Sequence, residues 1–152
     1  MVKPKRIGHV VLNVKDLAVS KRFYTEVLGF QVALDRPTGA FLTCGKIHHD
    51  LALFQAPEDA QPVSGGLGLN HFAVQISDID ELKEIYQRLK SAGAKIDHLT
   101  DHGMTKSVYF QDPDGIRIEF FFNTTETAEE GLELMRNPQE HTTELVLDEV
   151  SS

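Results

Sequence analysis

The stretch GHVVLNVKDL, residues 8–17, decides the fold, because it returns as NHFAVQISDI at residues 70–79. In both copies apolar residues alternate along a strand, and an aspartate suited to cap a helix follows. One shift of 62 residues carries His9 to His71, Asp16 to Asp78 and Tyr24 to Tyr86. The repeat therefore predicts a strand-then-helix unit used twice. If the two units pack about a pseudo-twofold axis, their histidines converge on that axis, as in a metal site built by duplication.

Turn residues and apolar runs extend each unit to one strand, one helix and three further strands. In the first module, about residues 7–57, strands are predicted at 7–14, 30–34, 40–44 and 50–55, with a helix over 18–28. In the second, about residues 67–123, strands are predicted at 69–76, 94–99, 106–111 and 116–122, with a helix over 78–92. A loop rich in proline, glycine and polar residues, 56–68, links the modules. Residues 1–123 are expected to form a single domain.

Residues 124–152 form an acidic C-terminal tail outside the repeat. One helix is indicated around Glu129–Arg136, and a short apolar run lies at Leu145–Leu147. The sequence leaves open whether this tail packs on the body, packs across to a second subunit or is partly disordered.

Composition excludes several classes of function. The 152 residues carry a net charge of −8 without a basic stripe, which disfavours a nucleic-acid partner. No apolar run approaches the roughly 20 residues of a membrane helix. The N-terminus lacks the apolar stretch of a signal peptide, and the single cysteine, Cys44, cannot form an internal disulfide. We therefore expect a cytoplasmic protein without a membrane partner.

Three residues are candidate metal ligands. His9 and His71 share one position of the repeat, on the strand face opposite the apolar set. Glu119 lies inside an apolar strand, and carboxylates are rarely buried unless they are paired or bind a metal. Two histidines and one carboxylate form the facial triad of non-haem Fe(II) oxygenases, which leaves three coordination positions open. The alternatives are hydrogen-bonded histidines on a sheet face and a surface pair of Arg117 with Glu119.

The repeat also indicates what the site lacks. Aligning the two closing strands places 117–120 over 51–54, so that Leu53 is the expected counterpart of Glu119. Leucine cannot bind a metal, and the predicted site therefore has no fourth protein ligand. An open site of this kind favours redox chemistry over a saturated metal site.

Three further residues are candidates for proton transfer. His49 lies in a His-His-Asp run before the closing strand of module one. Tyr109 lies on the strand paired with that of Glu119, and His102 lies in the loop that leads into it. A histidine and a tyrosine beside a metal can move protons to and from a phenol. The alternatives are a solvated pair of loop histidines and a tyrosine of the core.

These motifs resemble the vicinal oxygen chelate superfamily, which includes glyoxalase I, antibiotic-resistance proteins and extradiol dioxygenases. The resemblance covers Ile7 to about Asn123, with superfamily marks at 7–10, 23–30 and in the Asp-Pro-Asp-Gly turn at 112–115. It implies an α+β fold in which two tandem βαβββ modules form one cup-shaped, eight-stranded mixed sheet around a metal site. Segments 41–44 and 49–54 are similar to the part of the extradiol branch that carries its catalytic histidine, and 101–119 resembles its closing motif.

The extradiol resemblance implies a function. His9, His71 and Glu119 would hold Fe2+, with Mn2+ equally suited to this ligand set, His49 would act as acid and base, and Tyr109 and His102 would assist at the substrate. The implied reaction is cleavage of a catechol-like ring with O2. The resemblance also implies assembly into a homodimer or larger homo-oligomer. Two alternatives stay open: a glyoxalase-type metal-dependent isomerase or lyase, and a metal-free protein that sequesters a small aromatic compound.

Overall fold

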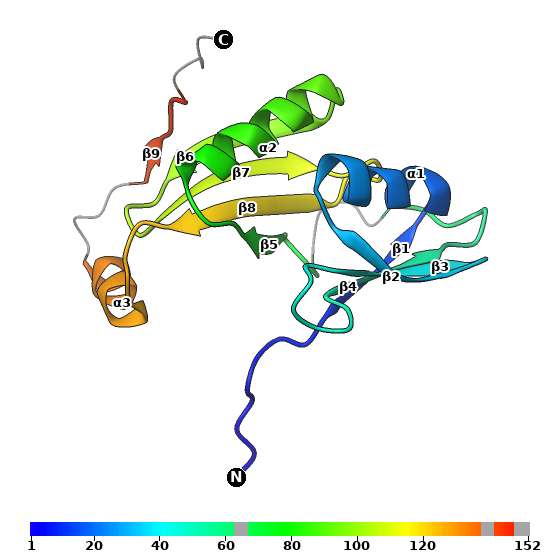
Figure 1. The fold of residues 1–152 in the computed structure, drawn as a ribbon, viewed down its shortest axis with the longest axis horizontal. Helices are drawn as coiled ribbons and strands as arrows, with labels where there is room; N and C mark the ends of the chain where they lie inside the picture. The colour runs from blue at the N-terminus through cyan, green and yellow to red at the C-terminus, as the bar shows by residue number, and fades with distance from the viewer. Residues whose placement is uncertain (63–66, 138–141, 148–152) are drawn as a thin grey trace. The chain divides into compact units, whose positions relative to one another are not determined.

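The computed structural model describes residues 1–62, 67–137 and 142–147. Parts of the predicted link and of the tail, residues 63–66, 138–141 and 148–152, lie outside this description. The chain divides into two compact units, Met1–Ser64 and Gly65–Ser152, each built around its own sheet (Figure 1).

The first unit contains a four-stranded sheet in the order β1-β4-β3-β2. Its elements along the chain are β1 (Val10–Val14), α1 (Leu17–Arg22), a π-helical turn (Phe23–Val27), β2 (Gln31–Arg36), β3 (Gly39–Thr43) and β4 (Leu51–Gln55). The first strand pairs with the last in parallel, and the other pairs are antiparallel. This is the β-α-β-β-β order predicted from the sequence.

The second unit repeats the arrangement with a five-stranded sheet in the order β5-β8-β7-β6-β9. Its elements are β5 (Phe72–Gln75), α2 (Ile79–Ser91), β6 (Lys95–Asp101), β7 (Thr105–Gln111), β8 (Arg117–Asn123), α3 (Ala128–Arg136) and β9 (Thr143–Glu144). Again the first strand of the module pairs in parallel with its last strand, β5 with β8. The short β9 adds the tail to the free edge of β6.

The α+β class and the two βαβββ modules are confirmed. The hydrogen bonds divide the strands into one sheet per unit, whereas the prediction has a single eight-stranded sheet. In each sheet the first strand of the module is the edge strand and bonds only to the module's last strand, β1 to β4 and β5 to β8. The strand pairs of the described residues therefore each lie within one unit. The tail helix is also confirmed as α3, and its additional strand is β9, just before the apolar run at Leu145.

Alternation gives β1 a buried and an exposed face, whereas the central strands β7 and β8 are largely buried on both faces. The face of each sheet away from its helix is termed the open face. In β1, Leu12 and Val14 are buried whereas Val11 and Asn13 are exposed, as period-two alternation requires. Figure 1 shows α1 on one face of the first sheet and α2 along one face of the second, each in contact with the strands of its own unit. The buried side chains Leu82, Ile85 and Leu89 seat α2 on its sheet. The opposite faces remain available for a site.

The first helix differs from the single α-helix predicted over 18–28. After Arg22 the chain widens into a π-helical turn, in which the Leu28 amide donates to the carbonyl of Phe23, five residues earlier. Tyr24, within this turn, is completely buried between Phe23 and Phe30. The helix ends at Gly29, whose φ of 86° is in the region that favours glycine.

No helix within the described ranges is long and apolar enough to cross a membrane.

The repeated aspartates cap the two helices, and one of them allows a direct test. The Asp78 carboxylate accepts from the amides of Asp80 and Glu81 at 3.0 Å. Replacing Asp78 with alanine leaves these amides without an intramolecular partner, so we expect the free energy of unfolding to fall by about 1 kcal/mol. Urea denaturation measures the change. Asp78→Asn, which keeps a capping oxygen, should lose far less, and an equal loss in both variants would contradict a capping role.

Candidate functional site

Glu119 forms the centre of a polar cluster on the open face of the second sheet. It lies in β8 opposite Ala73 of β5 and opposite Tyr109 of β7. Side chains directly opposite each other in paired strands share one face of the sheet. His71 comes two residues before Ala73 and therefore lies on the same side. The register thus brings His71, Glu119 and Tyr109 together, as the sequence predicts.

The carboxylate of Glu119 is nearly buried, with the residue 9% exposed. Oε1 accepts a hydrogen bond from the Ser107 hydroxyl at 2.6 Å, and Oε2 lies 3.2 Å from Nε2 of His71. Arg117 instead pairs with Asp97 at 2.9 Å, so the alternative of an Arg117–Glu119 surface pair is wrong. A carboxylate beside a hydroxyl and an imidazole, with no ion pair to arginine among the described residues, is suited to bind a metal.

The surroundings of His71 fit the same role. Its Nδ1 lies 2.7 Å from Oδ1 of Asn70, a carbonyl oxygen that only accepts hydrogen bonds. With the proton on Nδ1, the lone pair of Nε2 faces the carboxylate oxygen Oε2. Two acceptors 3.2 Å apart require a proton or a cation to hold them together. Metal-binding histidines use this arrangement, in which the second ring nitrogen donates to a fixed oxygen.

Tyr109 lies among three histidines. His98 stacks on its ring with the centroids 4.5 Å apart, and His71 meets it edge-on at 5.4 Å. Nε2 of His102 lies 3.1 Å from the phenol oxygen, which places the predicted proton-transfer pair within hydrogen-bond distance. Burial, and then the charge of Glu119 and a hydrogen bond to it, raise the pKa of Tyr109 to about 12. The phenol is therefore protonated near neutral pH and can donate a proton to an oxygen.

The remaining predicted residues, His9 and His49, meet on the first unit. Their ring centroids lie 4.6 Å apart, and Phe41 meets His49 edge-on at 5.3 Å. The contact follows from the strand pairing, because the Val10 amide donates to the Asp50 carbonyl and so joins the residues next to both histidines. Nδ1 of His48 lies 2.5 Å from Nδ1 of His49. Desolvation, followed by the nearby His48 and His9, lowers the pKa of His49, which favours its neutral, proton-accepting form.

The strand register corrects the predicted counterpart of Glu119. His9 and His71 immediately precede β1 and β5, so Val11 corresponds to Ala73. Val11 pairs with Ala52, whereas Ala73 pairs with Glu119. The counterpart of Glu119 is therefore Ala52, one residue before the predicted Leu53. The error arose from aligning apolar strands without their pairing partners, but the consequence is unchanged, because alanine cannot bind a metal either.

The proposed ligands are divided between the units, with His9 on the first and His71 and Glu119 on the second. Within the described part of the chain, no group of three or more His, Cys, Asp or Glu side chains is placed to hold a metal. The first unit therefore carries one of the three predicted ligands and the second unit carries two. These assignments as metal ligands stay predictions.

Sequence reasoning missed two residues of the cluster, Ser107 and His98. Ser107 is fully buried on β7, two residues before Tyr109 and hence on the same face. His98 faces Tyr109 across the β6–β7 pair, next to a bulge between Ile96 and His98. The two-residue spacing from Tyr109 was a usable signal for Ser107. The bulge shifts the register by one residue, so simple alternation along β6 does not predict that His98 faces Tyr109.

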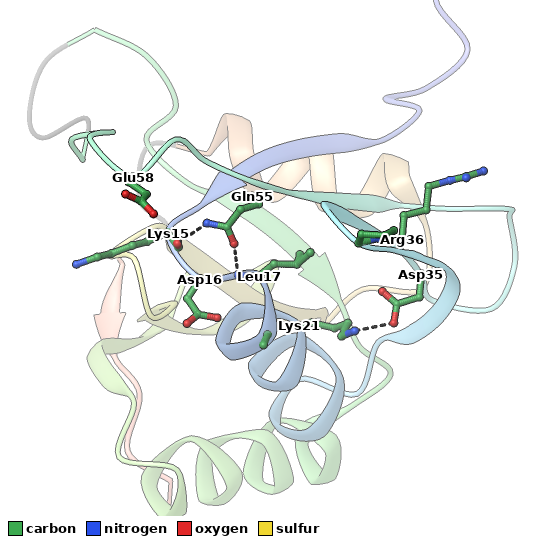
Figure 2. A pocket seen from close by; sticks show the side chains of 10 residues that line it. Lys15, Asp16, Leu17, Lys21, Asp35, Arg36, Gln55 and Glu58 are labelled. Atoms are coloured by element: carbon green, nitrogen blue, oxygen red, sulfur yellow. Dashed lines mark hydrogen bonds and ion pairs between the residues drawn. The ribbon is translucent and has the colours of Figure 1, made fainter.

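A hollow of about 820 Å³ on the first unit is lined by other residues than these clusters. Figure 2 shows its polar lining, in which Lys21 pairs with Asp35 at 2.6 Å. Gln55 bridges the amide of Leu17 and the carbonyl of Lys15 at 2.9 and 2.7 Å. These contacts join α1 to the ends of the strands. The lining contains none of the predicted site residues, and its charges compensate one another.

With this geometry described, comparison with known proteins identifies the family. Residues 6–120 match the family described as the Glyoxalase/Bleomycin resistance protein/Dioxygenase superfamily. The chain belongs to this superfamily. The resemblance inferred from the sequence motifs is thus confirmed.

The names of individual relatives of this chain state different activities. Biphenyl-2,3-diol 1,2-dioxygenase 3 of Rhodococcus globerulus is 32% identical over 148 residues, covering 96% of this chain and 77% of the relative. Glutathione transferase FosA of Serratia marcescens is 32% identical over 113 residues, covering 74% and 77%. Among solved structures, a lactoylglutathione lyase of Agrobacterium tumefaciens has a TM-score of 0.61 at 27% identity, covering 78% of this chain and 94% of that chain. The family is therefore established more firmly than the reaction.

The raised pKa of Tyr109 generates a prediction about Glu119. Replacing Glu119 with glutamine removes a negative charge beside the phenol, so we expect the pKa of Tyr109 to fall from about 12 toward its ordinary value of 10.0, remaining above it because burial persists. A pH titration of phenolate absorbance measures the shift, with Tyr109→Phe identifying the signal. Glu84→Gln on the surface of α2 is the matched control. An unchanged titration in Glu119→Gln would show that the two groups are not coupled.

Proposed function

We propose that the protein is a non-haem Fe(II)-dependent extradiol dioxygenase that cleaves a catechol-like aromatic ring with O2. The observation that carries the proposal is the nearly buried Glu119 carboxylate, with Oε2 facing Nε2 of His71 at 3.2 Å and without an arginine or lysine partner among the described residues. A buried carboxylate beside an imidazole nitrogen supports metal binding. Similarity to the biphenyl-2,3-diol dioxygenase supports the choice of reaction.

In this proposal His9, His71 and Glu119 hold the metal, and His49, Tyr109 and His102 handle protons. Bound Fe2+ would supply a site at which the catechol and O2 react as neighbours. The neutral His49 accepts a proton from a catechol hydroxyl, which increases the negative charge on the substrate oxygen. The protonated Tyr109, which lies beside His102 and hydrogen-bonds to Glu119, would turn its single proton from that carboxylate to a developing oxygen anion. These are positioning and proton-transfer tasks that the observed side chains suit chemically.

The second candidate is a glyoxalase-type isomerase or lyase, which the likeness to the lactoylglutathione lyase structure favours. A saturated site with four protein ligands would need a carboxylate on the first unit at the position equivalent to Glu119. Ala52 occupies that position. This speaks for a three-ligand site and hence for the dioxygenase. A metal-free binding protein is disfavoured because sequestering a ligand gives no reason to bury Glu119 beside His71.

The decisive experiment is anaerobic loading of the purified protein with Fe(II), followed by addition of catechols and O2. We expect oxygen uptake and a yellow ring-opened product with at least one catechol. Parallel loading with Mn(II), Ni(II) and Zn(II) distinguishes the metals, and incubation with a hemithioacetal substrate tests the isomerase. Absence of oxygen uptake across a broad catechol panel, together with metal-dependent isomerase activity, would overturn the dioxygenase proposal and support the isomerase.

Two substitutions separate metal binding from proton transfer. His49→Ala should retain iron but lower kcat by roughly 10²–10⁴-fold, because it removes a proton-transfer group and no ligand. Glu119→Ala should weaken iron binding at least about 100-fold, since even the loss of a ligand's hydrogen-bond partner costs about 10–100-fold. Iron content after gel filtration and steady-state oxygen uptake measure the two effects. Glu84→Ala is the surface control, and normal turnover by His49→Ala would exclude its proton-transfer role.

A further inference from the structure

Ser107 is a buried polar residue to which the proposed reaction assigns no task. Its side chain is completely shielded from solvent, and its hydroxyl donates to Oε1 of Glu119 at 2.6 Å. Burying a hydroxyl is costly unless a hydrogen bond compensates for the lost water. A hydrogen bond to a charged acceptor is among the stronger ones in proteins. The serine and the carboxylate therefore form one unit of the structure.

In the first module, the positions equivalent to Glu119 and Ser107 both lack a polar side chain. On the first unit, the register places Ala52 at the position of Glu119, Phe41 at that of Tyr109 and Gly39 at that of Ser107. A side chain could not simply be added at Gly39, because a Cβ there would lie 2.7 Å from the ring of Phe54. The unit without the carboxylate thus also lacks the hydroxyl, and an aromatic ring fills the space.

We propose that Ser107 is a positioning residue that fixes the Glu119 carboxylate with Oε2 directed at His71 and the metal; this inference rests on the metal site of the proposed function. The hydroxyl binds Oε1, and Oε2 is the oxygen that faces His71. Without the hydroxyl, the carboxylate is free to rotate, and a metal ligand whose hydrogen-bond partner is lost binds its ion more weakly.

The test compares metal binding by Ser107→Ala, Ser107→Thr and Ser20→Ala in the full-length chain. Ser20 is the matched control, because it is also a buried serine but its hydroxyl has no hydrogen-bond partner among the described residues. The probes are Mn(II), followed by the loss of the free-ion paramagnetic resonance signal, and Fe(II), titrated anaerobically. We expect Ser107→Ala to weaken binding about 10–100-fold, whereas Ser107→Thr, which keeps the hydroxyl, and Ser20→Ala stay within about threefold of the wild type.

The outcomes separate this inference from the proposed function. A wild-type affinity in folded Ser107→Ala overturns the positioning role and leaves the metal site standing, even if thermal stability falls. A wild-type protein that binds neither metal overturns the metal site and the inference together. If Ser107→Ala does not fold, Ser107→Cys retains a weaker donor of similar size, and intermediate affinity supports the proposal whereas unchanged affinity overturns it.

Discussion

The parallel pairing of β5 with β8 is the constraint on which the site depends. It joins the first strand of the second module to its last, across about 45 residues of intervening chain, and its register sets Ala73 directly beside Glu119. Because side chains alternate along a strand, this register also decides that His71 and the carboxylate share the open face. A slip of one residue would turn Glu119 toward α2 and into the apolar core. The burial of Ile118 and Phe120 on that other face holds the register.

The same constraint operates in the first unit, where β1 pairs with β4 and brings His9 to His49. The two modules use one scaffold and differ at the positions that face the site. Glu119, Tyr109 and Ser107 stand where the first module has Ala52, Phe41 and Gly39. Each replacement exchanges an apolar residue or glycine for a polar side chain. At these positions the modules differ in side-chain chemistry, because the strand pairing that carries the side chains is the same in both.

Burial of one carboxylate gives the second unit its chemical character. An isolated buried charge would be strongly unfavourable. The Ser107 hydroxyl stabilises one oxygen of Glu119, and the other lies 3.2 Å from Nε2 of His71, where a proton or a cation must join the two atoms. Its charge in turn contributes to the raised pKa of Tyr109, which keeps that phenol protonated. The charge of Glu119, the phenol proton of Tyr109 and the imidazole of His71 thus lie together on one face of one sheet. On the first unit, the lowered pKa of His49 leaves a neutral base.

The sequence by itself determined the modular plan and most of the candidate residues. The repeated histidine and aspartate, the alternation of apolar residues and the turn signals act locally, so they predict the strands, the helices and the N-caps at Asp16 and Asp78. Register, bulges and the packing of side chains between strands depend on contacts that are distant along the chain. For that reason only the tertiary structure decided that Ala52 rather than Leu53 is the counterpart of Glu119, that His98 stacks on Tyr109, and that a buried serine holds one oxygen of the carboxylate.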